Sequence, residues 1–307
     1  MKIFDAHCDV LYKLWLNPTL RFEDSKELHI TFERLKNGQG KVQCMAIYVP
    51  EEVPYQERFE VALEMVNILY EKILPLYPSL KLVKTKQDIK ALKEDEIGIL
   101  LTLEGCDAIG TSISRLKTLF HLGVKSVGLT WNYSNAVADG ILEPRGAGLS
   151  LFGKKVVQEN NRFKVWTDVS HLSIKGFWEV IELADYPIAS HSNALTLCNH
   201  PRNLNDDQLI ALIKKDSMIG INFVPYFLAE KPEATIKDVI KHIDYICSLG
   251  GERNIGFGSD FDGISQTVIG LEHFGKYEQL VEELYKHFTT QQITNFCYKN
   301  FCDHLPE

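Results

Sequence analysis

Eight short apolar runs, each bounded by turn-forming residues, are spread along the whole chain and alternate with amphipathic segments. The runs cover residues 2–9, 42–49, 97–104, 126–131, 164–171, 187–191, 218–224 and 254–260. Apolar residues at three- and four-residue spacing predict helices over 55–76, 112–122, 174–184, 206–215, 235–249, 277–288 and 291–301. Eight strand–helix repeats with near-continuously apolar strands are typical of an α/β fold, the (β/α)8 TIM barrel.

A doubly wound α/β sheet is the alternative architecture. No G-x-G-x-x-G follows the first run, however, and the candidate site residues come from many strands, which a closed barrel explains better. No linker or low-complexity segment divides the chain, so we expect a single barrel domain over residues 1–307. Two long connections, 11–41 and 132–162, follow the first and fourth strands, and we expect loops of this length to carry substrate recognition.

Composition narrows the class of partner and the compartment. The chain has 33 basic and 41 acidic residues, a net charge of −8, which disfavours nucleic acid and anionic membrane surfaces as partners. Its seven cysteines are odd in number and form no C-x-x-C pair, as expected of reduced thiols. No signal-like apolar segment occurs near the N-terminus, and no run approaches the roughly 18 residues of a membrane span. We therefore expect a cytoplasmic protein without membrane attachment.

The first apolar run ends in a histidine and an aspartate that alternation places on one face of the strand. These residues are His7 and Asp9. As a bare pattern His-x-acid is weak, since His242 and Asp244 repeat it inside a predicted helix, where residues i and i+2 do not face each other. The first copy gains weight from its position, because active sites of TIM barrels lie at the C-terminal ends of the strands.

Further imidazoles and carboxylates end other predicted strands: Glu104 the third, His171 the fifth, His191 the sixth and Asp260 the eighth. Each alone has an ordinary structural explanation as a turn, cap or hydrogen-bonded core residue. Together at one barrel mouth they would leave buried charge uncompensated, whereas two divalent cations would satisfy them all. Mixed nitrogen and oxygen ligands suit Zn²⁺, and also Mn, Co or Fe.

Six motifs carry a resemblance that covers nearly the whole chain. They are DAHCD at 5–9, LEG at 103–105, DVSH at 168–171, SHSNA at 190–194, PRN at 201–203 and GFGSDFDG at 256–263. In combination they resemble the membrane (renal) dipeptidase family, a binuclear-zinc branch of the amidohydrolase-type barrels. The resemblance implies a metal-dependent dipeptidase that cleaves the peptide bond of a dipeptide by a metal-bridged hydroxide.

The resemblance also implies a role for each matching residue. His7 and Asp9 would bind one Zn²⁺, His171 and His191 the other, and Glu104 would bridge them. Asp260 would be the catalytic acid/base and would anchor the substrate amine, while Arg202 would pair with the substrate carboxylate.

The chemistry of these residue types supports the same roles independently. Two metal ions can generate a nucleophile at neutral pH, and a neighbouring carboxylate can carry the proton of water to the leaving amine. A planar guanidinium is the expected receptor for a terminal carboxylate. Without the resemblance, Arg202 could equally be a surface residue near the start of a helix.

One position departs from the family pattern. The fourth strand of mammalian members ends in a histidine that stabilises the oxyanion, whereas this chain has Trp131 followed by Asn132. We therefore expect Trp131 and Asn132 at the substrate, with oxyanion stabilisation from the indole, from Asn132 or from the metals alone.

Two other functions stay open on the sequence. A related binuclear hydrolase could act on another amide, a lactone or a β-lactam ring, although such a substrate without a free carboxylate would not need Arg202. A barrel could instead bind metal and ligand without turnover, although Asp260 argues against that. The sequence also leaves a homodimer open.

Overall fold

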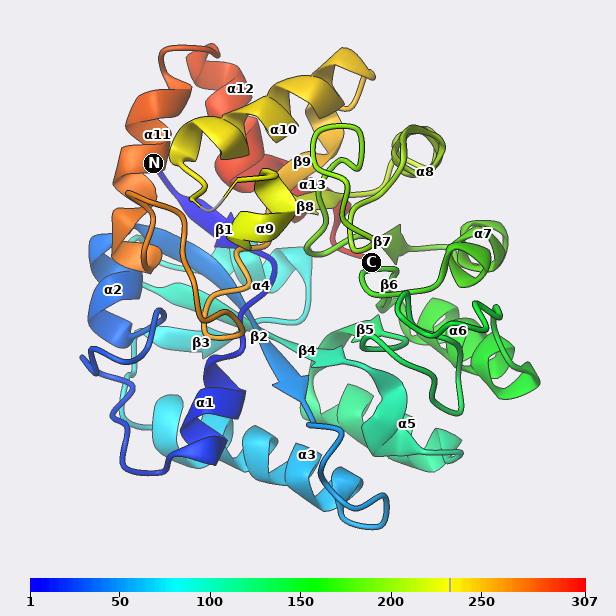
Figure 1. The fold of residues 1–307 in the computed structure, drawn as a ribbon. Helices are drawn as coiled ribbons and strands as arrows, with labels where there is room; N and C mark the ends of the chain where they lie inside the picture. Colours follow the sequence, from blue (N-terminus) through cyan, green and yellow to red (C-terminus); the bar gives the residue numbers. More distant parts are fainter. Residues whose placement is uncertain (232) are drawn as a thin grey trace.

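The computed structural model describes residues 1–231 and 233–307, and its centre is a barrel of eight parallel strands (Figure 1). The order around the barrel is β7-β6-β5-β4-β2-β1-β9-β8. The two ends of this order meet in a bridge between Ala189 and Ile219, where Gly220 N donates to the Ala189 carbonyl over 2.8 Å. The predicted (β/α)8 barrel is confirmed. Its strands are β1 (Ile3–Asp5), β2 (Gly40–Tyr48), β4 (Ile97–Glu104), β5 (Val124–Gly128), β6 (Trp166–Asp168), β7 (Pro187–Ile188), β8 (Ile219–Ile221) and β9 (Ile255–Phe257).

Helices surround the strands, with α6, α7 and α8 on one side and α10, α11 and α12 on the other (Figure 1). Each segment that the sequence predicts as helical coincides with helices of the structure, because it buries an apolar stripe against the barrel. Their bounds are α3 (Arg58–Asn67), α5 (Ile113–Leu122), α7 (Ile174–Leu183), α8 (Asp206–Lys214), α10 (Ile236–Ser248), α11 (Tyr277–Leu284), α12 (Thr290–Thr294) and α13 (Asn300–His304). The short α9 (Pro225–Leu228) follows β8.

The two long connections contain more regular structure than expected. The first holds α1 (Val10–Leu16) and α2 (Phe32–Asn37), and the second ends in α6 (Leu151–Phe163). The apolar stripe of α6 is interrupted by the buried Asn160, which donates to Thr167 Oγ1 over 2.9 Å. A polar residue at this core-facing position conceals the helical period, which explains why the sequence does not predict α6. Only the part of this connection before α6 is a loop. The sequence also misses β3 (Leu80–Leu82), which pairs with the first residues of β4, and α4 (Lys86–Ala91).

Backbone packs directly against backbone where β7 and β8 close the barrel. A Cβ at Gly220 or at Gly258 would overlap the carbonyl oxygen of Ser190, so both positions require glycine. This contact fixes the chain at the point where it leaves β7. No helix within residues 1–231 and 233–307 is long and apolar enough to cross a bilayer.

Candidate active site

The candidate site residues lie just beyond the strands, on the loops that the barrel holds at its C-terminal end. Glu104 is the last residue of β4, whereas the others follow their strands by two to four residues. The strands β1, β6, β7 and β9 end earlier than predicted, because the chain leaves the sheet here and turns these side chains inward. His171 and Asp260 have φ of 68° and 65°, in the left-handed region that residues other than glycine rarely adopt. The residues brought together are His7, Asp9, Glu104, His171, His191 and Asp260.

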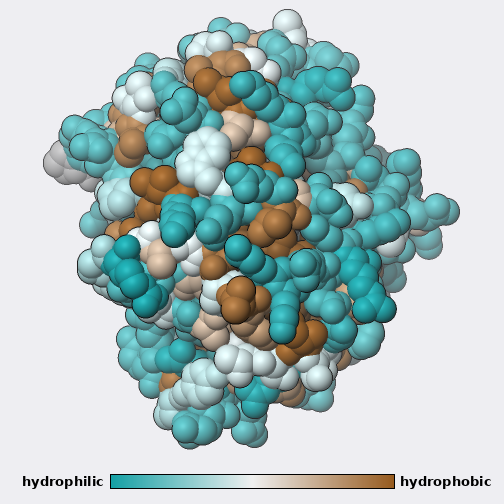
Figure 2. Space-filling model, turned by 90° about the vertical axis from the view of Figure 1, so that its right-hand side faces the viewer, coloured by the Kyte–Doolittle hydropathy of each residue, from teal (hydrophilic) through white to brown (hydrophobic). Residues whose placement is uncertain are grey.

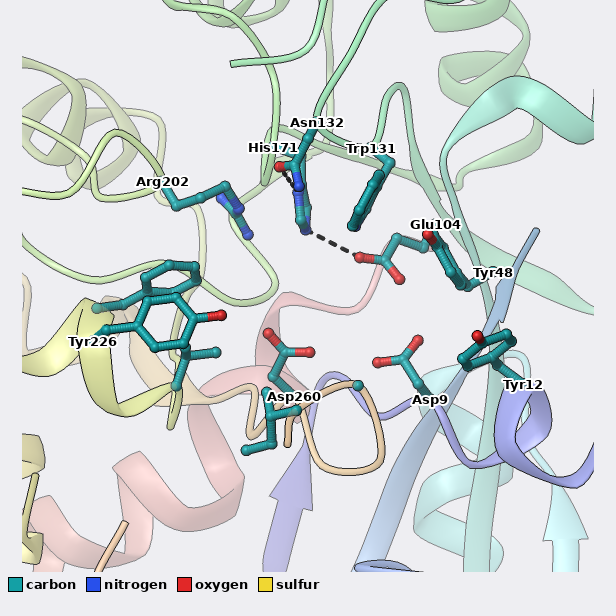
Figure 3. A pocket seen from close by; sticks show the side chains of 14 residues that line it. Asp9, Tyr12, Tyr48, Glu104, Trp131, Asn132, His171, Arg202, Tyr226 and Asp260 are labelled. Carbon is teal, nitrogen blue, oxygen red and sulfur yellow. Dashed lines mark hydrogen bonds and ion pairs between the residues drawn. The ribbon is translucent and has the colours of Figure 1, made fainter. Parts of the chain in front are cut away.

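The carboxylate of Glu104 lies between two groups of imidazoles. Its Oε2 is 3.5 Å from His7 Nε2. Its Oε1 is 3.0 Å from His171 Nε2, the pair joined in Figure 3, and 3.7 Å from His191 Nε2. The Nε2 atoms of His171 and His191 are 2.9 Å apart. Oε2 of Glu104 thus faces the imidazole of His7, and Oε1 faces the imidazoles of His171 and His191.

The acidic side of the site has buried polar atoms that lack protein partners. His7 Nε2 lies 3.3 Å from Asp9 Oδ2 and 4.0 Å from Asp260 Oδ1. Within the described residues, His7 Nε2 and Asp9 Oδ1 form no hydrogen bond. Two groups have the spacing of metal ligands: His7, Glu104 and His191, and His7, Asp9 and Asp260. Orphaned donors and acceptors of this kind fit divalent cations, which would satisfy them together.

Burial and mutual charge shift the pKa values of these groups. Burial opposes protonation of His7, but the carboxylates of Glu104 and Asp9 outweigh it and raise its pKa well above the ordinary value. Burial likewise opposes ionisation of Glu104, yet His7 and His171 hold its pKa well below the usual range. Burial lowers the pKa of His171 to about 3 and also lowers that of His191. Neutral imidazoles at these two positions keep a lone pair available for a metal ion.

The remaining ring nitrogens of the two histidines have partners of their own. His171 Nδ1 lies 2.8 Å from Asn132 Oδ1, and His191 Nδ1 lies 2.7 Å from Ser190 Oγ. Ser190 Oγ in turn donates to the carboxylate of Asp168. Partners at Nδ1 orient each ring so that Nε2 points toward Glu104.

Asp260 is held by a residue that the sequence did not single out. Asn222 Nδ2 donates to Asp260 Oδ2 over 2.9 Å. Burial raises the pKa of Asp260, and the nearby charge of Glu104 adds to the rise. No local pattern marks Asn222, because its partner is 38 residues away in the chain.

Arg202 is a buried cation without an acidic partner. Its residue is 5% exposed, its Nη2 donates to the His191 carbonyl over 3.4 Å, and its guanidinium carbon lies 5.6 Å from the centre of the Phe227 ring. Burial lowers its pKa to about 10. Across the described part of the chain, Arg202 forms no ion pair and its Nε no hydrogen bond. A buried guanidinium in this state suits an anionic ligand.

One pocket of about 270 Å³ is lined by Asp9, Glu104, His171, Arg202 and Asp260, together with aromatic side chains (Figure 3). Aromatic rings form one wall, with centres 5.3 Å apart for Tyr12 and Tyr48 and 5.4 Å apart for Tyr48 and Trp131. Tyr226 lies on the side of Arg202 (Figure 3), and its ring centre is 4.7 Å from that of Phe227. The pocket has a cation at one end and carboxylates at the other, which fits a small zwitterion.

The sequence of the whole chain matches one protein family. A family model described as membrane dipeptidase (peptidase family M19) matches residues 1–305. The chain belongs to this family. Dipeptidase aclJ of Aspergillus oryzae is 34% identical over 279 residues, 86% of this chain and 66% of that protein. An uncharacterized dipeptidase of Schizosaccharomyces pombe, C965.12, is 32% identical over 307 residues, 91% of this chain and 73% of that protein.

A solved structure of the dipeptidase family superposes closely. The metallopeptidase from Rhodobacter sphaeroides, liganded with a phosphinate mimic of the dipeptide L-Ala-D-Ala, has a TM-score of 0.93 and 27% identity, covering 99% of this chain and 98% of its own. The predicted family, hydrolase class and metal-dependent dipeptidase function are therefore confirmed, and the two alternative functions are not favoured.

Proposed function

We propose that this dipeptidase hydrolyses the peptide bond of a dipeptide with two divalent metal ions, for which Zn²⁺ is favoured by the mixed imidazole and carboxylate donors. His7 and Asp9 would hold one ion, and His171 and His191 the other. Glu104 would hold both. The observation that carries the proposal is the position of Glu104, whose two oxygens face different imidazole groups at 3.5 and 3.0 Å.

Asp260 carries the proton in this proposal. When bound, the two ions would polarise the scissile carbonyl and lower the pKa of water. Asp260 Oδ1, which is not engaged by Asn222, takes a proton from the attacking water and delivers it to the leaving amine. The raised pKa of Asp260 makes its ionised carboxylate a stronger base toward the water proton.

Arg202 and the acidic side of the site together select the length of the substrate. Arg202 binds the terminal carboxylate, and Asp260 anchors the amine at the other end. Trp131 shapes the pocket beside Tyr48, and Asn132 contacts the substrate from the same loop. A dipeptide satisfies both ends of a pocket of about 270 Å³.

Metal content and substrate range test the proposal together. Protein grown with ample zinc should contain two ions per chain, and strong chelation should abolish hydrolysis of dipeptides. Arg202→Ala should lower kcat/KM by the equivalent of about 2–4 kcal/mol. Dipeptides should also be cleaved far better than their C-terminal amides. A metal content near zero with undiminished hydrolysis would exclude the two-metal mechanism, and equal rates on acids and amides would exclude the role of Arg202.

The cellular setting and assembly are also proposals. Seven free cysteines support a reducing, cytoplasmic location. Ile174 and Trp178 on α7 are exposed apolar side chains. Figure 2 shows a face of the molecule on which apolar patches are separated by hydrophilic ones. The homodimer and the single domain over 1–307 stay predictions.

A further inference from the structure

The two histidines that face Glu104 Oε1 are supported in different ways. His191 is backed by Ser190 and Asp168, which lie on β7 and β6 or directly after them and are buried in the barrel. His171 is backed by the side chain of Asn132, whose Oδ1 lies 2.8 Å from Nδ1 (Figure 3). Asn132 is half-buried and lines the substrate pocket. One histidine is thus oriented by the barrel and the other by a pocket loop.

The loop that carries Asn132 is itself fixed against the loop of His171. Leu142 N donates to the Asn132 carbonyl over 2.9 Å, and Ile141 N donates to the His171 carbonyl over 2.6 Å. A Cβ at Gly140 would overlap the backbone of Asn132, so the start of this loop is packed against its own residues 140–142. These bonds hold the amide of Asn132 in place beside the ring.

The Asn132 side-chain oxygen can accept a hydrogen bond from the His171 ring only when Nδ1 of the ring carries a proton. If Nε2 of His171 is to offer a lone pair to a metal ion beside Glu104 Oε1, the ring proton must be on Nδ1. The oxygen of Asn132 accepts a hydrogen bond from that N–H, whereas the side chain of the preceding Trp131 has only an N–H donor. Within the described residues Asn132 Nδ2 has no recorded hydrogen bond, so the amide protons are free to donate into the pocket.

We propose that Asn132 is a positioning residue for His171: its oxygen fixes the Nδ1–H tautomer and the ring orientation, separately from any contact that its NH₂ group makes with substrate. The inference rests on the proposed role of His171 as a metal ligand. It assigns to one side chain of the pocket loop the task that Ser190 and Asp168 share for His191.

Three variants separate the two ends of the amide. Asn132→Ala removes both the acceptor and the donor, Asn132→Asp keeps an acceptor for His171 and removes the donor, and Tyr133→Ala changes an exposed neighbour on the same loop. Affinity for Zn²⁺ and Co²⁺ is measured by chelator competition, and the visible spectrum of the Co²⁺-loaded protein reports the ligand geometry. Asn132→Ala should weaken one of the two ions by about 10–100-fold and alter the Co²⁺ spectrum. Asn132→Asp should restore the affinity for that ion, while kcat stays low because the amide donor is missing. Tyr133→Ala should match the native protein in metal affinity and in the Co²⁺ spectrum.

His171→Ala distinguishes failure of this inference from failure of the proposed function. If His171→Ala loses one ion but Asn132→Ala binds both with native affinity, Asn132 does not position the ring and the inference is wrong. A loss of affinity in Asn132→Ala that Asn132→Asp does not restore would overturn it as well, because a merely structural role predicts that result. If His171→Ala also retains both ions, the two-metal site itself is misassigned and the inference falls with it.

Discussion

Asn222 Nδ2 donates to Oδ2 of Asp260 over 2.9 Å, which leaves only Oδ1 of that carboxylate facing His7, 4.0 Å from its Nε2. Asn222 is fixed in turn, because Val224 N donates to its Oδ1 over 2.6 Å and its own backbone N donates to Asn193 Oδ1 over 3.0 Å. The carboxylate therefore cannot rotate freely, and its reactive oxygen has one defined direction.

Asp260→Asn should retain the fold and both metal ions but lose about 10²–10⁴-fold in kcat, because an amide cannot carry the proton. The measurement is kcat together with metal content on the same sample. Asn222→Ala, which keeps the carboxylate and removes only its hydrogen bond, should lose less. A near-normal kcat in Asp260→Asn would assign proton transfer to another group.

Glu104→Gln should weaken both metal ions, because each oxygen of Glu104 faces a different imidazole group. Elemental analysis after dialysis against a weak chelator gives the stoichiometry of the variant and of the native protein. If one ion were lost and the other kept native affinity, the carboxylate would not be shared.

Trp131→Phe should leave kcat nearly unchanged and shift the preference among dipeptide side chains. The indole packs 5.4 Å from the centre of Tyr48 and 6.2 Å from that of His171, as a wall residue would. Rates on a panel of dipeptides in all four stereochemical combinations test this. A loss of about 10²-fold in kcat with unchanged preference would instead identify the indole N–H as an oxyanion donor.

Asp238 provides a pH-dependent contribution to stability at the start of α10. Although burial opposes it, hydrogen bonds from Lys231 Nζ at 2.6 Å and Thr235 N at 2.9 Å hold the pKa of Asp238 well below its ordinary value. Because the folded-state pKa is the lower one, this stabilisation is complete above the unfolded pKa of about 4 and is lost as pH falls toward the folded-state value.

Asp238→Asn should therefore lower the free energy of unfolding at pH 7 by about 1–3 kcal/mol, and the difference should shrink below pH about 4. Urea unfolding at pH 7 and in acid measures it. Asp244→Asn, an exposed aspartate on the same helix, serves as the control and should have little effect. A difference that grows in acid would contradict the assignment.

The repeating pattern of apolar runs predicted the barrel because parallel strands buried on both faces leave a strong signal in any single sequence. The pattern failed where a side chain broke the local rule. Asn160 occupies a core-facing position of α6, and the prediction consequently treated 132–162 as one insertion. The three-residue β3 is too short to give a period.

The residues of the candidate site that end strands could be predicted, since the C-terminal ends of the strands converge at one mouth of the barrel irrespective of loop conformation. The supporting residues were not, because each meets a partner that follows a neighbouring strand but lies far away in the sequence. Asn132 contacts His171 across 39 residues of chain, and Asn222 contacts Asp260 across 38. Asp168 could be read either as a partner of a ligand or as an ordinary strand-end acid, and only the position of Ser190 places it behind His191.

Two glycines at the closure of the barrel affect the geometry of the candidate site although they are not part of it. Gly220 and Gly258 have no side chain to offer a metal or a substrate, yet any larger residue at either position would push the carbonyl of Ser190 away. The next residue along the chain is His191, so the displacement would reach the imidazole and its distance to Glu104 directly. In a mutational library selected for activity, these two positions should therefore tolerate as little change as the candidate ligands, although sequence annotation by chemical type would never mark them.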